Sequence, residues 1–194
     1  MNELKRIDEF RAVLADYKIS ESAQKTLEQT KLVLLVGVSG CGRNTIINEL
    51  VRGGHFHFVV SDTTRQPRMN DGVMEQDGKE YWFRTEDEVL QDLQDGKYLE
   101  AEIIHGQQVS GISVRELEQA HREGRIAITD VDIGGVSNVM QTKPDTFALM
   151  ILPPSFGEWQ RRINKRGEMP AAEFRRRLQT AARIFGRAET DEFM

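Results

Sequence analysis

The feature that most constrains this fold is a strand, a glycine-rich turn and a helix in direct succession. An apolar run from Leu32 to Val36 is followed by GVSGCGRNT, and the next segment carries Ile46, Ile47 and Leu50 at helical spacing. Glycine tolerates positive φ, so successive N–H groups of such a turn can converge on an anion beside the helix N-terminus. This order predicts an α/β fold with a phosphate-binding loop. The alternative is a glycine-rich turn that binds no ligand.

We expect the loop to hold ATP through its backbone and two side chains. The residues assigned to ATP binding are Gly37, Val38, Ser39, Gly40, Cys41, Gly42, Arg43, Asn44 and Thr45. Arg43 stands where the motif has Lys and is expected to reach the outer phosphates, while the hydroxyl of Thr45 is placed to ligate Mg²⁺. Arginine keeps the charge but is planar and bulkier than an ammonium group, which predicts slower turnover rather than none. Asn44 stands where the motif has Ser or Thr.

Charge and composition narrow the class of protein. A net charge of −5 over 194 residues argues against general affinity for nucleic acid. No apolar run approaches the roughly 20 residues that span a bilayer, and the first residues, MNELKRIDEF, are charged, so we expect a cytoplasmic protein without a membrane partner. The single Cys41 excludes an internal disulfide. Its thiol is either a redox switch beside a helix N-terminus or, as we interpret it, a small residue that fits.

Hydrophobic spacing predicts a helical extension over residues 1–30, followed in the sequence by alternating strands and helices. Strands are predicted at 32–36, 56–61, 81–83, 98–104, 107–112, 126–131 and 147–152, and helices at 4–17, from 20 or 22, after the loop, at 86–93, at 113–123, from 155 and from about 171. The polar segment 65–78 is predicted to be loop and turn. This alternation predicts a three-layer α/β sandwich with a mainly parallel sheet and ligands at the carboxyl ends of its strands. The short strands between 81 and 112 are expected to form an inserted small sheet.

Blocks downstream of the loop carry a resemblance to a known family. They are SDTTRQPR at 61–68, GKEYWF at 78–83, YLE at 98–100, DVDIGGV at 130–136 and LPPS at 152–155, followed by Arg162, Arg166 and Arg177. In this order they resemble guanylate kinase, a P-loop nucleoside monophosphate kinase. The resemblance covers about 32–187. It implies a domain over 31–194, with a GMP-binding β insertion at about 62–112 and a helical lid at about 160–178.

The resemblance implies a phosphate site for GMP in the first of these blocks. Arg65 and Arg68 match the family's two phosphate-binding arginines, and Tyr81 matches the tyrosine that donates its hydroxyl to the same phosphate. Guanidinium forks suit phosphate oxygens, and Pro67 stiffens the loop between them. Taken alone, Tyr81 would be interpreted as an ordinary strand aromatic.

The resemblance also implies a guanine pocket. Glu100 matches a glutamate that accepts from guanine N1–H and the exocyclic amine, and Ser61 and Asp132 complete the set. A carboxylate would instead face the N1 acceptor of adenine, so this residue favours GMP over AMP. The family places Asp130 near the metal and its waters. The alternative for Asp130 and Asp132 is a pair of strand-end caps, and for Glu100 a solvated strand residue.

The late basic segment is expected to serve catalysis. Arg162, Arg166 and Arg177 match lid and hinge arginines that close on the phosphates of both nucleotides, and with Arg43 they form the implied catalytic set. The implied reaction converts GMP and ATP to GDP and ADP with Mg²⁺ as cofactor, mainly through alignment and charge stabilisation. The alternative for the basic run is a solvated helix face.

Several departures from the family pattern leave alternatives open. Val109 and Ser110 stand where the family usually has a second phosphate-binding tyrosine, and the chain is expected to lack the family's C-terminal strand and helix. The N-terminal helices either pack against the domain or mediate a homodimer. The competing functions are a guanylate kinase-like module that binds phosphorylated peptides without turnover, and a kinase for a different phosphorylated acceptor.

Overall fold

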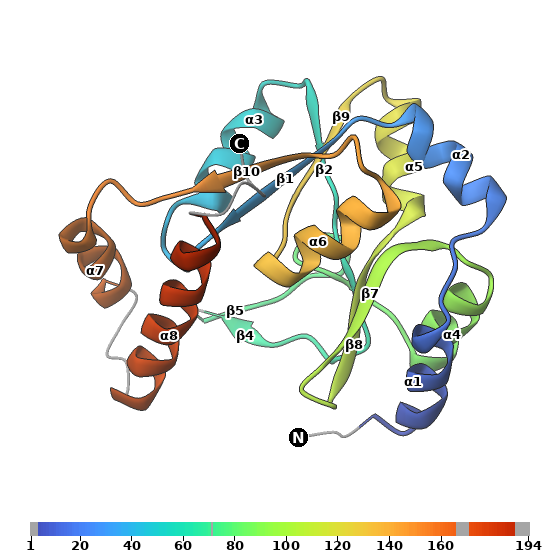
Figure 1. Ribbon diagram of the computed structural model, residues 1–194, viewed down its shortest axis with the longest axis horizontal. Helices are drawn as coiled ribbons and strands as arrows, with labels where there is room; N and C mark the ends of the chain where they lie inside the picture. Colours follow the sequence, from blue (N-terminus) through green and yellow to red (C-terminus); the bar gives the residue numbers. More distant parts are fainter. Residues whose placement is uncertain (1–3, 71, 166–170, 189–194) are drawn as a thin grey trace. The chain divides into compact units, whose positions relative to one another are not determined.

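The computed structural model describes residues 4–70, 72–165 and 171–188, so that Arg166 and the C-terminal residues 189–194 lie outside it (Figure 1). The chain divides into two compact units, which we describe separately. The first unit comprises Met1–Lys31 and His57–Ala127, and the second comprises Leu32–Phe56 and Ile128–Met194. Within the described ranges, no helix combines the length and apolarity needed to cross a bilayer.

The second unit is built on a pair of parallel strands. β1 (Leu32–Gly37) runs beside β10 (Phe147–Ile151), with Val33 opposite Phe147 and Gly37 opposite Ile151 (Figure 1). The sequence of β1, LVLLVG, is apolar without alternation and almost wholly buried, as expected for a strand covered on both faces. Both α3 (Arg43–Arg52) and α6 (Ile133–Thr142) pack against β1. The fold class predicted from the sequence, α/β with a parallel sheet, is confirmed.

Two further strands complete the sheet that contains β1. Its order is β10-β1-β9-β2, where β9 spans Ile126–Asp130 and β2 spans Phe56–Phe58. The strand predicted over 56–61 is therefore shorter than expected, although Val59 and Val60 behind it are buried. Asp130 ends β9, so its carboxylate stands at the edge of the sheet where ligands of α/β proteins bind.

Two helices follow β10 in the second unit. α7 (Phe156–Asn164) begins after Ser155, whose hydroxyl accepts from the backbone N–H of Glu158 at 3.1 Å, and α8 spans Ala171–Ala188. One hydrophobic cluster joins them to the glycine-rich loop; its buried members are Val38, Cys41, Trp159, Ile163, Ala181 and Ile184. Cys41 is therefore a core residue, which agrees with its interpretation as a small residue that fits.

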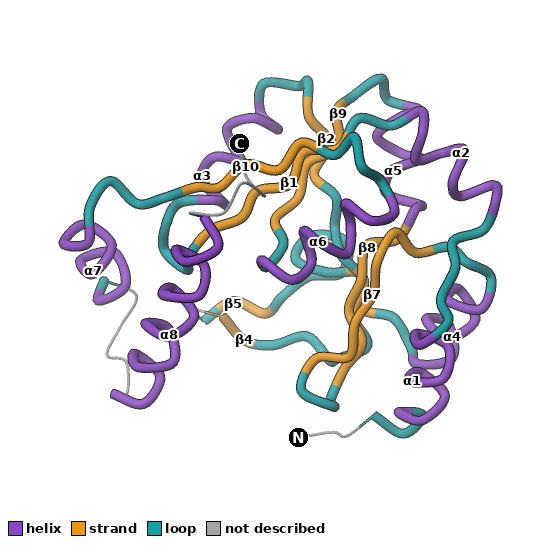
Figure 2. Tube along the Cα trace, in the orientation of Figure 1, coloured by secondary structure: helices purple, strands orange, loops and turns teal. Residues whose placement is uncertain are grey.

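The first unit carries a smaller mixed sheet of order β6-β3-β8-β7. Its long strands, β7 (Tyr98–Ile104) and β8 (Gln108–Ser113), form an antiparallel hairpin (Figure 2). The short strand β3 (Asp62–Thr63) pairs antiparallel with β8 and parallel with β6 (Trp82–Phe83). Strands β6, β7 and β8 are the short strands that the sequence predicts between 81 and 112, whereas β3 was not predicted.

The N-terminal helices pack within the first unit. α1 (Ile7–Ala15) contacts β7 and α4 (Glu86–Gln94), and α2 (Glu21–Gln29) contacts α5 (Val114–Arg122). Phe10 is fully buried in the cluster between α1 and α4. Burial of this side chain contributes about 1.5–3 kcal/mol of stability relative to leaving it exposed. The hydroxyl of Tyr17 both donates to the carbonyl of Tyr98 (2.6 Å) and accepts from its N–H (2.7 Å). Of the two roles left open for these helices, packing against the domain is observed.

Besides the shorter β2, helix α6 and a small hairpin differ from the sequence-based expectations. α6 was not predicted, because Gly134 and Gly135 in its first turn have low helix propensity; the carboxylate of Asp132 starts the helix by accepting from the Gly135 N–H at 2.8 Å. The segment predicted to be loop also contains a small antiparallel hairpin, β4 (Met69–Asn70) with β5 (Val73–Met74). Two-residue strands give too short a pattern to detect from sequence.

A histidine and two carboxylates tie β2 to α5. Nε2 of His57 lies 3.4 Å from Glu116, and Nδ1 lies 3.1 Å from Glu123. Glu116 is buried and also accepts from the backbone N–H of Val60 (3.1 Å) and the indole of Trp82 (3.0 Å). The hydrogen bond to Glu116 raises the pKa of His57 above 6.5 despite the opposing effect of burial.

The raised pKa of His57 predicts a pH-dependent stability. Because the folded state holds the proton more tightly, the stabilisation is complete below pH 6.5 and is lost as pH rises through the higher folded pKa. We expect a loss of less than about 1 kcal/mol in the free energy of unfolding, since the cluster is partly solvated. Urea unfolding of wild type and His57→Gln on both sides of that pKa measures it. An equal pH slope in the two proteins would contradict the prediction.

Candidate functional site

The glycine-rich loop has the backbone shape that an anion cradle requires. Gly40 and Gly42 adopt φ of +85° and +113°, which residues with a side chain rarely adopt. Gly37 is needed for a different reason, because a Cβ there would lie 2.4 Å from the carbonyl oxygen of Ile151. The loop thus joins β1 to α3 through positions where only glycine is readily accommodated.

Several N–H groups of the loop are available for a ligand. Those of Ser39, Gly40, Gly42 and Arg43 donate to none of the described residues, and no side chain caps the start of α3. Such groups together with the helix dipole favour an anion. Thr45 is exposed in the first turn of α3, where its hydroxyl can reach a metal bound to that anion.

Arg43 points to the carboxyl end of β9. Its Nη1 atom lies 3.2 Å from the carboxylate of Asp130 and donates to the carbonyl of Val131 at 3.3 Å. The Arg43 side chain is 20% exposed and that of Asp130 is 31% exposed, so both are accessible to a ligand bound at the surface. Thr45 and Asp130 would supply only two oxygen donors, which suits Mg²⁺ because this ion keeps several waters and phosphate oxygens.

Two of the three predicted lid arginines contact the loop. Arg162 donates from Nη1 to the carbonyl of Cys41 at 3.1 Å, and Arg177 donates from Nη1 to the hydroxyl of Ser39 at 3.4 Å. Arg166, the third, lies outside the described residues. The structure therefore gathers Arg43, Arg162 and Arg177 with the loop in the second unit.

The first unit gathers the residues predicted to bind the acceptor phosphate. Arg65 forms a two-pronged ion pair with Glu75, with N···O distances of 2.5 and 2.9 Å, and its guanidinium lies 4.7 Å from the centre of the Tyr81 ring. Burial alone would lower the pKa of Arg65, but the hydrogen bond to Glu75 raises it above its ordinary value. Glu75 also accepts from the backbone N–H of Arg68 at 2.9 Å. The Glu75 carboxylate thus holds Arg65 and the backbone of Arg68, and Tyr81 contacts Arg65.

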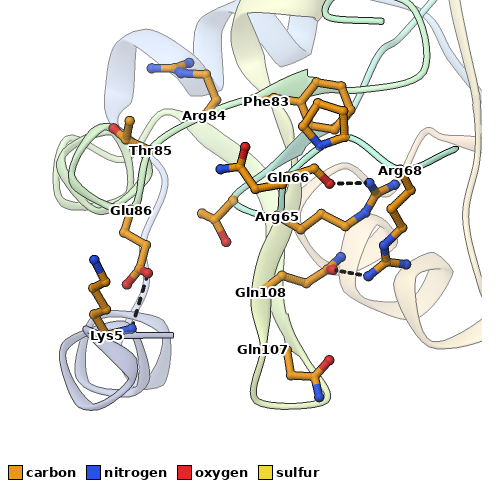
Figure 3. Close-up of a pocket in the computed structure, with 12 residues that line it drawn as sticks. Lys5, Arg65, Gln66, Arg68, Phe83, Arg84, Thr85, Glu86, Gln107 and Gln108 are labelled. Atoms are coloured by element: carbon orange, nitrogen blue, oxygen red, sulfur yellow. Dashed lines mark hydrogen bonds between the residues drawn. The ribbon is translucent and has the colours of Figure 1, made fainter. Parts of the chain in front are cut away.

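A cavity of about 970 Å³ opens beside these arginines (Figure 3). Its lining residues are Lys5, Thr64, Arg65, Gln66, Pro67, Arg68, Phe83, Arg84, Thr85, Glu86, Gln107 and Gln108. Figure 3 shows the amide of Gln108 directed at Arg68, to which it is linked by a hydrogen bond of 3.4 Å, while Lys5 and Glu86 lie on the other side. The cavity can admit a polar, anionic ligand of nucleotide size.

The residues predicted to contact guanine are divided between the units. Ser61 precedes β3, and its carbonyl accepts from the Trp82 N–H at 3.0 Å; Glu100 is half-buried on β7, opposite Ile112. Asp132 belongs to the second unit, where it is the cap of α6. The capping alternative weighed for Asp132 is therefore observed, while its contact with a base stays a prediction.

The sequence did not reveal two residues, one in each unit, that hold predicted site residues in place. Glu75 lies in a polar segment with turn signals, and nothing in its neighbourhood marks it as the partner of Arg65. Trp159 lies on α7, 120 residues from the loop, yet its indole donates to the carbonyl of Ser39 at 2.8 Å. Only the path of the folded chain reveals either contact.

Comparisons with known proteins agree with the residue pattern. The family model described as guanylate kinase matches residues 29–194. "Guanylate kinase 1" of Oryza sativa is 34% identical over 167 residues, covering 85% of this chain and 41% of that protein. The guanylate kinase of Rhodococcus jostii is 34% identical over 171 residues, covering 87% of this chain and 80% of that protein. This chain therefore spans less than half of the plant relative and most of the bacterial one.

A solved structure has the same fold. The crystal structure of guanylate kinase from Anaplasma phagocytophilum matches with a TM-score of 0.58 at 24% sequence identity. The match covers 84% of this chain and 74% of that one. At this identity the likeness concerns the fold alone.

Proposed function

This chain belongs to the guanylate kinase family, and from that premise we propose that it transfers the γ-phosphoryl group of ATP to GMP, giving ADP and GDP. The observation that carries the proposal is the loop, in which Gly40 and Gly42 have positive φ. Its N–H groups at Ser39, Gly40, Gly42 and Arg43 donate to none of the described residues. A module that only binds phosphorylated peptides would have no need of this second anion site.

In the proposed reaction an oxygen of the GMP phosphate attacks the γ-phosphorus, and the bond from that phosphorus to ADP breaks. The loop N–H groups and Arg43 hold the ATP phosphates, while Arg65, Arg68 and Tyr81 hold the acceptor phosphate. Because both partners are anions, bringing them into line and stabilising the transferred charge are the main tasks of the protein. Arg162, Arg166 and Arg177 are proposed to add positive charge on the ATP side.

The proposal includes Mg²⁺ as cofactor and a cytoplasmic location. Thr45 and Asp130 would hold the ion, directly or through its waters, and Mg²⁺ bound there supplies further neutralisation of phosphate charge. The domain assignment remains part of the proposal: an extension over 1–30, an acceptor insertion at about 62–112 and a lid at about 160–178.

The test is an ADP-release assay with Mg-ATP and a panel of GMP, dGMP, AMP, CMP and UMP. We expect turnover with GMP and little with AMP, because Glu100 faces two donors on guanine and an acceptor on adenine. Turnover confined to another nucleotide would make the chain a kinase for a different acceptor. If no ADP is released with any of these nucleotides and the protein binds a phosphorylated peptide, the result would favour a binding module.

Glu100→Gln provides a sharper form of this test. The amide keeps the size of the side chain but offers one acceptor and one donor group, so one contact to guanine is kept and the other is replaced by two donors that face each other. We expect kcat/KM for GMP to fall about 10- to 100-fold and KM for ATP to stay within about twofold. Equal GMP kinetics in wild type and variant would remove Glu100 from the base pocket.

A further inference from the structure

The carbonyl groups of the glycine-rich loop are held on the side away from its free N–H groups. The carbonyl of Ser39 accepts from the indole of Trp159 at 2.8 Å, and that of Cys41 accepts from Arg162 at 3.1 Å. The carbonyl of Val38 accepts from the Cys41 N–H at 3.1 Å within the loop itself. A peptide plane whose C=O is fixed on one side presents the N–H of the next residue on the other.

Trp159 is built into the support of the loop. The residue is 2% exposed, and a Cβ placed on Gly40 would lie 3.9 Å from the indole and 3.4 Å from Ile163. The loop therefore rests on α7 at Gly40, between the two carbonyls that α7 binds. A buried indole N–H that lost this acceptor would be left unpaired at a cost, so the contact restrains the loop.

Arg162 reaches the loop in a fixed orientation. Its Nε donates to Glu158 at 2.7 Å, one turn earlier on α7, while Nη1 donates to the carbonyl of Cys41. Hydrogen bonds from Arg161 first and then from Arg162 lower the pKa of Glu158 to about 2, so its carboxylate is ionised at neutral pH. The planar guanidinium thus spans two acceptors that a lysine could not hold in the same geometry.

We propose that Trp159 and Arg162 are positioning residues for ATP binding, which act by holding the loop carbonyls outward so that the loop N–H groups converge on the ATP phosphates. The inference rests on the proposed function and adds a role for α7. Neither residue needs to touch the transferred phosphoryl group. Through the loop, the two residues act on the binding of ATP and ADP before the chemical step, in addition to the positive charge that Arg162 adds on the ATP side, and they leave the affinity for GMP unchanged.

Trp159→Phe is the main test, because it keeps an aromatic ring and removes the N–H donor. We expect KM for ATP and the calorimetric Kd for ADP to rise about 3- to 10-fold, as for one lost hydrogen bond, with KM for GMP unchanged. Ile184→Ala is the matched control. Ile184 lies in the same cluster at 6% exposure, so its truncation lowers Tm without touching a loop carbonyl. An ADP Kd that rises no more in Trp159→Phe than in Ile184→Ala overturns the inference.

A second variant covers the case in which Trp159→Phe does not fold. Arg162→Lys keeps the charge but cannot hold Glu158 and the Cys41 carbonyl together, so it too is expected to raise the Kd for ADP. An effect confined to kcat would instead place Arg162 on the transferred phosphoryl group and overturn its positioning role. Failure of the wild-type protein to bind ADP would overturn the proposed function as well, whereas ADP binding equal in wild type and variants would overturn only this inference.

Discussion

Arg65→Ala is expected to reduce kcat/KM for GMP by at least about 100-fold and to leave KM for ATP nearly unchanged. The guanidinium is held by Glu75 and stacked at 4.7 Å on the Tyr81 ring. Glu75 and the carbonyl of Gln66 account for three of its N–H groups. The Nε–H and a second Nη2 hydrogen lie on a different edge of the group, which matches two oxygens of a phosphate.

The same substitution also removes the counter-ion of a buried carboxylate. The Glu75 side chain is 5% exposed, so leaving its carboxylate without Arg65 is expected to lower the free energy of unfolding by about 3 kcal/mol. The double variant Arg65→Met with Glu75→Gln separates the two effects. It removes both charges of this pair, and Gln still offers an oxygen to the Arg68 N–H. We expect the double variant to regain most of the stability in urea unfolding while GMP turnover stays low. Recovery of GMP turnover would contradict the role of Arg65.

Arg43→Met is expected to lower kcat by about 100- to 1000-fold, because an unbranched apolar side chain replaces the cation at the first residue of α3, directly after the loop. Met approximates the length of the side chain and removes the ion pair with Asp130, which is partly exposed and contributes little to stability. We therefore expect Tm to change little. Single-turnover kinetics with Mg-ATP and saturating GMP would measure the chemical step apart from product release.

Arg43→Lys is the matched control for that experiment. An ammonium group can follow the γ-phosphate as a compact charge, so kcat is expected to equal or exceed that of the wild type. A Lys variant as slow as the Met variant would mean that the planar fork, with its contacts to Asp130 and the carbonyl of Val131, is itself required. A fast Met variant would exclude Arg43 from catalysis altogether.

Much of the fold could be predicted from local pattern. The strand at 98–104 was placed with its observed bounds, Tyr98–Ile104, because apolar and β-branched residues at both ends are set off by Gly96 and Gly106. Helix starts are predicted at Ser20 or Ser22 and at Ser155. The structure has them at Ser20 and Ser155, whose hydroxyls each accept a first-turn N–H. The helix α6 escaped because a Gly-Gly pair obscures the helical signal, and only packing against β1 compensates for that low propensity.

The sequence by itself determined the chemistry that is present: a glycine-rich turn between a buried strand and a helix, and pairs of arginines spaced to hold phosphates. These follow from short-range rules, since φ preferences, capping and hydrophobic period act within a few residues. The tertiary structure alone decided which groups hold that chemistry in place. Glu75 meets Arg65 across 10 residues, and Trp159 meets Ser39 across 120, because folding of the intervening chain brings them together. Such pairings depend on the path of the whole backbone, which no local pattern encodes.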